Sequence, residues 1–465
     1  MPTQHSKFFL DAKCKDYVHP WTDSCVSATA GLGLHSLQEC LRIYSTVYIA
    51  TLLMRGKIPT KDDIKHTVLG ILQSTAFLSW SGFSYSMFIC LIRRILGNFN
   101  LVTVSFLPSF LSSLTGILIE RPSRRSALCL YVSNIATETL FNMAVSRGYV
   151  SPIPYGQVYI FAASVALLLY FYRSKPNKQD SIYKIMRIIV GKHEDAVNLE
   201  EVQQKQNVTL AETNVDRKTT NSKIQSRKQG LSTVFKALQV YKGIIDWLKG
   251  QGKHVSCPHP HSCAHYILTN GARIFGYGVC AQMAVRMIFQ MKKLISKPQS
   301  IKSILSQKEN YNLAIFLGGF ASLYRLVSCS MRRMYKEDSP YYAVPAGLVA
   351  SIAFMMFPNN TIALYFMWKA LQMFWNDSVE KGLLPDVKGF IIFLYCFSTA
   401  VLFHAAIVEP TNLRSSYWKF LYNLSGGRIA AMSRIPIDKF GLDTVRKLEE
   451  VLRKTNTTDK HMYSF

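Results

Sequence analysis

Residues 389–408 read GFIIFLYCFSTAVLFHAAIV, twenty positions without a lysine, arginine, aspartate or glutamate. An α-helix of about 20 apolar residues crosses the hydrocarbon core of a bilayer, which is about 30 Å thick. Similar blocks occur at 68–92, 101–119, 126–146, 155–172, 311–331, 341–357 and 361–376. A soluble helical protein would carry polar faces along such helices, and these blocks lack them. The sequence therefore predicts an all-α multipass membrane protein.

The charged residues also point to a membrane. The chain has 465 residues, of which 49% are hydrophobic and 18% charged, and its net charge is +26. Many basic residues stand at the ends of the apolar blocks, such as Arg93 and Arg94 or Arg121, Arg124 and Arg125. Basic residues at these places contact lipid headgroups and orient the spans. Strong positive charge can also attract nucleic acid, but this placement favours membrane lipids, and we expect no nucleic-acid partner.

Two copies of one pattern run along the chain. The stretch HPWTDSC (19–25) is echoed by HPHSC (259–263), and CLIRR (90–94) is echoed by CSMRR (329–333). Residues 113–176 align with the second copy at an offset of 234 positions without a gap. Residue identity is low, so the order of these landmarks and the matching hydropathy carry the comparison. We predict two tandem copies of a four-helix transmembrane unit.

Each copy opens with an apolar segment that polar residues interrupt, 28–54 in the first and 264–290 in the second. We predict an interfacial or extra helix at these places. The distribution of lysine and arginine favours eight spans in parallel repeats, with both termini on the more basic side. Ten spans in inverted repeats is the alternative.

The copies divide the chain into four regions. These are a first membrane repeat with an N-terminal Cys/His segment (1–191), a polar linker (192–253), a second membrane repeat (254–430) and a C-terminal tail (431–465). Residues 192–230 of the linker have a composition typical of disorder. Residues 231–249, LSTVFKALQVYKGIIDWLK, carry one apolar stripe and predict a helix on the membrane surface.

The second repeat begins with HVSCPHPHSCAH (254–265), which holds two cysteines and four histidines. A structural zinc ion requires four ligands. The first copy keeps Cys14, His19 and Cys25 but lacks counterparts of three of the histidines, namely His254, His261 and His265. We therefore interpret the stretch as a pair of reduced thiols on a segment next to the membrane, and expect no metal. A zinc site and a disulfide are the alternatives.

Further cysteines and several polar residues lie within the predicted spans. Cysteines inside apolar blocks, such as Cys90 and Cys396, are expected to behave as small hydrophobic residues. Glu138 and Gln372 occupy equivalent positions, and an ionisable group within a span usually faces protein or water. Such a pair lines a cavity or forms hydrogen bonds between helices. His404, near the end of a span, is interpreted as a polar tip at the interface.

Glu138 shares one helical face with Tyr131 and Asn134, so we expect this face to pack against neighbouring helices. The sequence contains no P-loop, no dinucleotide-binding glycine motif and no nucleophile elbow. We therefore expect a protein that is not an enzyme and has no cofactor, with no catalytic residue to assign.

Four motifs together resemble the transmembrane protein 135 family. They are HPWTDSC (19–25), ILIERPSRR (117–125), NIATETLF (134–141) and RSSYWKFL (414–421), and the resemblance extends over about 14–436. It implies a multipass protein of mitochondrial and peroxisomal membranes, linked to mitochondrial fission through a dynamin-related GTPase, to peroxisome organisation and to lipid metabolism. The second copy is also similar to the four-helix channel family of inner-membrane protein translocases, on its span count and small residues such as Gly318 and Gly347.

Two classes of function follow from these observations. In the first, the protein is a non-enzymatic regulator in organelle membranes that organises partners through its basic side and its linker. In the second, it is a transporter or lipid-handling protein with a path between the two repeats. Internal duplication favours the second class, while the lack of repeated charge pairs or broken helices within the spans favours the first.

Overall fold

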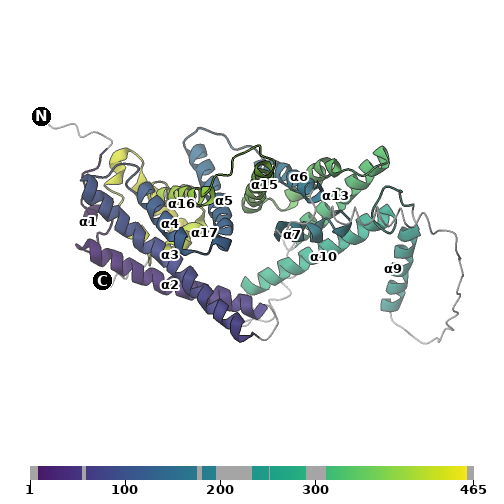
Figure 1. Cartoon of the computed structure of the whole chain (residues 1–465), viewed down its shortest axis with the longest axis horizontal. Helices are drawn as coiled ribbons and strands as arrows, with labels where there is room; N and C mark the ends of the chain where they lie inside the picture. The colour runs from purple at the N-terminus through teal and green to yellow at the C-terminus, as the bar shows by residue number, and fades with distance from the viewer. Residues whose placement is uncertain are drawn as a thin grey trace. The chain divides into compact units, whose positions relative to one another are not determined.

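The computed structural model describes residues 9–54, 59–174, 181–194, 233–250, 252–289 and 311–457 (Figure 1). Regular structure in these ranges is helical, apart from one antiparallel bridge between Leu10 and Phe99. The predicted all-α multipass class is confirmed.

The helices follow the predicted order in both copies. The first copy contains α1 (Cys14–Tyr17), α2 (Cys25–Met54), α3 (Lys61–Leu96), α4 (Phe106–Ile119), α5 (Pro122–Ser146), α6 (Gly156–Ser174) and α7 (Ser181–Ile189). The second contains α10 (Cys263–Phe289), α13 (Asn312–Tyr335), α14 (Ala343–Ala350), α15 (Asn360–Glu380), α16 (Phe390–Val408) and α17 (Ser415–Leu424). The predicted extra helices before each four-helix unit are α2 and α10.

Further elements connect and extend the copies. They are η1 (Lys192–Glu194), α9 (Thr233–Gly250), η3 (Pro340–Tyr342), η4 (Ser351–Met356), η5 (Pro410–Asn412), α18 (Arg428–Ala431), η6 (Ile437–Phe440) and α19 (Thr444–Thr455). Residues 195–232 lie outside the described residues, and with them most of the segment predicted to be disordered. The first three residues of that segment form η1, in which Glu194 is fully buried. The polar linker therefore begins later than predicted.

Local sequence sets where the longest helix begins and ends. Thr60 and Asp63 form a capping box at the start of α3, in which the Asp63 N–H donates to Thr60 Oγ1 at 3.2 Å and the Thr60 N–H donates to Asp63 Oδ2 at 3.1 Å. Gly97 ends the helix with φ of 73°, a left-handed conformation that glycine adopts without steric cost. The equivalent helix α13 ends in the same conformation at Lys336, with φ of 60°.

Four of the described helices are long and apolar enough to cross a membrane: α3, α6, α13 and α16. They correspond to four of the eight predicted spans. Two other predicted spans, 101–119 and 341–357, form shorter apolar helices. The last two lie in α5 and α15, which have sufficient length but are interrupted by polar residues such as Glu138 and Lys369.

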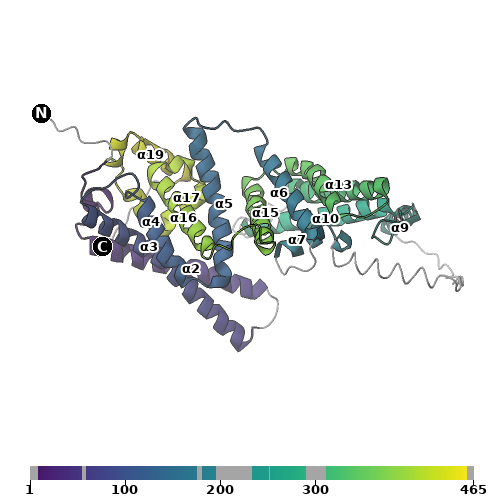
Figure 2. The same ribbon diagram turned by 45° about the horizontal axis from the view of Figure 1, so that its top comes forward.

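The chain forms two compact units. Unit 1 combines Met1–Pro152 with Gly382–Phe465, and unit 2 is Ile153–Lys381. In unit 1, α16 of the second copy packs against α4 and α5 of the first (Figures 1 and 2). In unit 2, the equivalent helix α6 of the first copy packs against α14 and α15 of the second. The copies have thus exchanged their fourth helices, so the units do not follow the predicted boundaries at 191 and 254.

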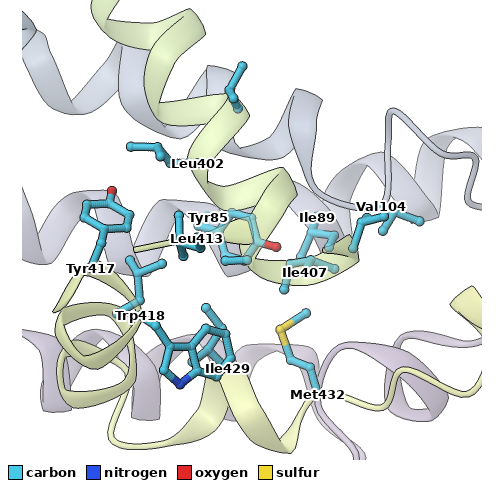
Figure 3. Packing of buried hydrophobic residues seen from close by; sticks show 14 of the residues in the cluster. Tyr85, Ile89, Val104, Leu402, Ile407, Leu413, Tyr417, Trp418, Ile429 and Met432 are labelled. Carbon is cyan, nitrogen blue, oxygen red and sulfur yellow. The ribbon is translucent and has the colours of Figure 1, made fainter. Parts of the chain in front are cut away.

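Each unit has its own core. In unit 1, Tyr85 and Ile89 of α3 share one buried cluster with Leu402 and Ile407 of α16, and the fully buried Trp418 belongs to the same cluster (Figure 3). The predicted C-terminal tail belongs to this core, because three of its apolar residues are buried in the same cluster: Ile437, Leu448 and Val451. In unit 2, the ring of Phe161 from α6 stacks on Phe354 with centroids 4.1 Å apart.

The helix α9 forms where the sequence predicts a helix, at 231–249. Where side chains of this helix are described, its exposed large apolar residues are Val240, Ile244 and Trp247, spaced by four and three positions along one face.

Candidate functional site

Unit 1 contains a cluster of three thiols and one imidazole, which we call cluster 1. It consists of Cys14, His19, Cys25 and Cys90, whose sulfur and ring nitrogen atoms all lie within 4.8 Å of one another. Cys14 and Cys25 are the first residues of α1 and α2, and Cys90 lies in the last turns of α3. Only 1% of His19 is exposed. A surface cavity of about 730 Å³ borders all four residues, so solvent and ions can reach them.

Unit 2 contains cluster 2, made of the same residue types. Cys257, His259, Cys263 and Cys329 have their ligand atoms within 4.8 Å of one another. Cys263 begins α10, and Cys329 lies near the end of α13. The side chains of Cys257 and His259 are almost completely buried, at 1% and 0% exposure. The Sγ atoms of Cys257 and Cys263 lie 3.8 Å apart.

The two clusters are built in the same way. In each, a cysteine and a histidine precede a long helix, a second cysteine begins that helix, and a third comes from the next helix of the hairpin. Cys90 lies six residues before Leu96, the end of α3, and Cys329 lies six residues before Tyr335, the end of α13. These two cysteines are the first residues of the repeated Cys-x-x-Arg-Arg motif.

The histidines are held in one orientation. His19 Nδ1 lies 2.8 Å from the carbonyl oxygen of Thr22, and His259 Nδ1 lies 2.6 Å from that of His261. A carbonyl only accepts hydrogen bonds, so Nδ1 carries the proton in both rings. The other nitrogen, Nε2, faces the sulfur atoms, at 3.2 Å from Cys25 Sγ in cluster 1 and 3.6 Å from Cys329 Sγ in cluster 2. Metal-ligating histidines commonly use this arrangement.

Several contacts fix the segment that carries the first two ligands of cluster 1. Leu10 exchanges two backbone hydrogen bonds with Phe99, of 2.7 and 2.9 Å. The buried Tyr17 hydroxyl donates to the carbonyl of Val104 at 2.8 Å. Arg93 Nε donates to the carbonyl of Ala12 at 2.7 Å. The first arginine of the Cys-x-x-Arg-Arg motif thus holds the chain beside Cys14.

One thiol in each cluster, Cys14 in cluster 1 and Cys257 in cluster 2, has a lowered pKa. The hydrogen bond with Cys90 lowers the pKa of Cys14 against the opposing effect of burial, and Cys329 has the same effect on the pKa of Cys257. Burial lowers the pKa of His19, but its hydrogen bond with Cys14 raises this pKa to about 9. A metal ion binds thiolate and neutral imidazole, so binding at cluster 1 would release protons.

The structure adds one cysteine to each group of cysteines and histidines that the sequence places together. The sequence indicates an incomplete ligand set in the first copy and predicts that Cys90 behaves as a small hydrophobic residue. The structure brings Cys90 and Cys329 into the clusters as their fourth members. Of the four histidines in 254–265, it selects His259. All ten cysteines are free thiols, so the alternative of a disulfide is not observed.

A second buried polar group, which we call the charge network, lies in unit 2. Arg332 donates from Nη1 and Nη2 to the two carboxylate oxygens of Glu194, at 2.9 and 2.6 Å. Its Nε donates to Asp338 at 2.9 Å, and Arg173 also pairs with Asp338. Arg332 and Glu194 are fully buried, and 1% of Arg173 is exposed. Two arginines and two acids make the network electrically neutral.

The sequence-predicted polar positions do not form one site. Glu138 accepts a hydrogen bond of 2.9 Å from Arg414 Nε in unit 1. His404 Nδ1 lies 2.9 Å from the hydroxyl of Ser105, also in unit 1. Gln372 belongs to unit 2, where it accepts a hydrogen bond of 2.9 Å from the buried Lys369. Of the face predicted to pack, Asn134 is buried, but 57% of Tyr131 is exposed.

We expect Glu138→Gln to lower the stability of unit 1 and Glu138→Leu to lower it more. Both remove the charge opposite Arg414, whose side chain is only 21% exposed, and leucine also removes the acceptor. A buried donor left unpaired costs about 1–3 kcal/mol. The measurement is thermal unfolding of the full chain in detergent, with the exposed Glu450→Gln as control. Leucine tolerated as well as glutamine would rule out a structural role for the pair.

Buried and partly buried acids of unit 1 form ion pairs that join separate elements. Glu409, which is 2% exposed, accepts hydrogen bonds from Arg147 at 2.8 Å and from the side chain of Asn412 at 2.9 Å. Together with the Glu138–Arg414 pair, this contact joins α5 to the segment that follows α16.

One protein-family model matches the part of the chain that contains cluster 1. Residues 11–145 match the family model of the N-terminal cysteine-rich region of transmembrane protein 135. The matched range contains all four residues of cluster 1. No solved structure matches the chain. This match over residues 11–145 supports assignment of the chain to the transmembrane protein 135 family.

Proposed function

We propose that the protein is a non-enzymatic membrane protein of mitochondria and peroxisomes that regulates mitochondrial fission, peroxisome organisation and lipid metabolism. The observation that carries this proposal is the match of residues 11–145 to the N-terminal cysteine-rich region of transmembrane protein 135. The four apolar helices long enough to cross a membrane agree with a membrane location.

The environment of the charged residues supports a non-enzymatic role. The acids Glu138, Glu194 and Glu409 are each paired with an arginine from another element of the same unit. Such pairs fix the positions of helices, whereas a general acid or base needs access to a substrate. We therefore propose that the protein acts through partners, among them a dynamin-related fission GTPase and membrane lipids.

Gene removal and re-expression test this proposal. Cells that lack the protein should have longer mitochondria, altered peroxisome number and altered neutral lipid, and the full chain should restore all three. The tagged protein should co-fractionate with mitochondria and peroxisomes and recover the GTPase after cross-linking. The proposal fails if the protein is absent from both organelles, or if organelle length and number do not change on its removal.

The alternative is a transporter or lipid-handling protein, and the internal duplication is the observation that favours it. Duplicated membrane units with equivalent helices are common among transporters. Purified protein in liposomes distinguishes the two: flux of ions, small metabolites or labelled lipid above that of empty liposomes would favour transport over regulation.

A further inference from the structure

We propose that cluster 1 and cluster 2 each bind one structural zinc ion, so that the full chain holds two. The proposal concerns a metal centre and is independent of the organelle function. It rests on the ligand types, on the distances between ligand atoms, on the orientation of the histidines and on the occurrence of the same arrangement twice.

The distances agree with tetrahedral zinc. Zn–S bonds of about 2.3 Å and Zn–N bonds of about 2.05 Å at tetrahedral angles place two sulfurs about 3.8 Å apart, and a sulfur and a nitrogen about 3.6 Å apart. In cluster 2, Cys257 Sγ and Cys263 Sγ are 3.8 Å apart, and His259 Nε2 and Cys329 Sγ are 3.6 Å apart. In cluster 1, the His19–Cys25 distance of 3.2 Å is somewhat shorter.

The ligand types select the metal. Three thiolates and one imidazole form a Cys₃His set, which is a common structural zinc set. Soft sulfur ligands disfavour magnesium and calcium, which bind oxygen. An iron–sulfur cluster divides its ligands among several iron atoms, whereas the four ligand atoms in each cluster lie within 4.8 Å of one another. That compact set surrounds a single ion.

The surroundings orient the ligands before a metal binds. The Nδ1–H groups of His19 and His259 donate to backbone carbonyls, which directs Nε2 at the thiols. The ring of His259 also stacks on Tyr266, with centroids 4.5 Å apart and planes at 17°. Both rings therefore present a nitrogen to the centre of the cluster without rearrangement, which is the behaviour expected of a metal site rather than of isolated thiols.

The zinc ions would join parts of the chain that are far apart in sequence. Cys25 and Cys90 are 65 positions apart, and Cys263 and Cys329 are 66 positions apart. In each copy the ion would tie the beginning of the first hairpin helix, and the segment before it, to the end of the second. Metal binding contributes directly to folding free energy. Each ion would therefore stabilise the contact between the two helices of a hairpin, at the end away from the loop that connects them.

Metal analysis of the full chain tests the proposal. Protein purified in detergent without chelator should contain two zinc ions per chain and no stoichiometric iron. The double variants Cys25→Ser, Cys90→Ser and Cys263→Ser, Cys329→Ser should each retain one. Cys280→Ser, at an exposed cysteine outside both clusters, should retain two. Well under one zinc per chain in the wild type, or the same zinc content in all variants, would overturn the proposal.

Thiol reactivity of the unmodified chain provides a readout that does not depend on whether the variants fold. The six cluster cysteines should resist alkylation in the native protein and react after a zinc chelator is added, while the exposed Cys280 should react at once in both conditions. Peptide mapping identifies each position. Alkylation of the cluster cysteines that does not change with the chelator, or a Cys257–Cys263 disulfide in freshly purified protein, would contradict zinc binding.

Discussion

Glu194→Gln is expected to destabilise unit 2 by about 3–5 kcal/mol, because it removes one charge from a buried network and leaves its partners buried. Glu194 accepts hydrogen bonds of 2.9 and 2.6 Å from Arg332, and both side chains have no exposed surface. Glutamine has a similar shape but no charge, and it has a single acceptor oxygen. Two arginines would then face only Asp338.

Thermal unfolding of the full chain in detergent measures this effect, and a substitution at a nearby exposed acid serves as the control. Glu337 is exposed and lies next to Asp338 in sequence, so Glu337→Gln should shift the unfolding temperature little. Replacing both Glu194 and Arg332 by apolar residues of similar size should recover part of the loss, since an apolar pair needs no partner. Equal unfolding temperatures for wild type and Glu194→Gln would mean that the network does not stabilise unit 2.

The contribution of Glu194 to stability should also depend on pH. Burial alone would raise the pKa of Glu194, but Arg332 and Arg173 lower it to about 2, from an ordinary value of 4.5. A carboxylate with a lowered folded-state pKa stabilises fully above its unfolded pKa and loses this contribution as the pH falls through the folded value. The difference in unfolding temperature between wild type and Glu194→Gln should be constant from about pH 6 upward and shrink below about pH 4.5.

Hydropathy was sufficient to predict where the apolar helices lie but not their partners. The predicted block 68–92 lies within α3, which extends further at both ends, from Lys61 to Leu96. The exchange of α6 and α16 between the copies does not appear there. Equivalent helices carry similar apolar surfaces, so either could cover α4 and α5, and periodicity alone does not indicate which one does.

The fourth ligands of the clusters were missed for a related reason. Spacing rules for zinc sites compare residues that are close in sequence, and Cys90 and Cys329 lie more than sixty positions from the nearest other ligand. A signal was present: each copy places a cysteine in the same Cys-x-x-Arg-Arg motif. A cysteine repeated at equivalent positions of a duplicated sequence is better explained by a shared partner than by its apolar character.

Composition predicts that Glu194 lies in a disordered linker, but the structure buries it, for a different physical reason. Its neighbours in the chain are polar, which suggested a solvated linker, but two buried arginines from α6 and α13 require an acid at that place. The partner of Glu138 was also distant, since Arg414 lies 276 positions further along. Ion pairs between remote segments leave no periodic pattern, so a single sequence does not reveal them.

The second large effect on stability is expected for Gly278→Leu, at the contact between α10 and α13. A Cβ atom at Gly278 would lie 2.6 Å from Cα of Ala314, so one of the two backbones would have to move. Glycine at a helix contact allows this close approach, and an added side chain in a packed interface typically costs about 1–3 kcal/mol or more. We therefore expect Gly278→Leu to lower the unfolding temperature of the full chain in detergent and to reduce its yield.

Gly276→Leu is the matched control for this substitution. Gly276 lies on the same helix two positions earlier, and a Cβ atom there would meet no other atom within 4 Å. Leucine also favours a helix over glycine by about 0.5–1 kcal/mol, so Gly276→Leu should leave the unfolding temperature unchanged or raise it slightly. Because the two variants add the same side chain to the same helix, any difference between them reports the contact with Ala314. If both are tolerated equally, α10 and α13 do not approach as closely at Gly278 as the structure places them.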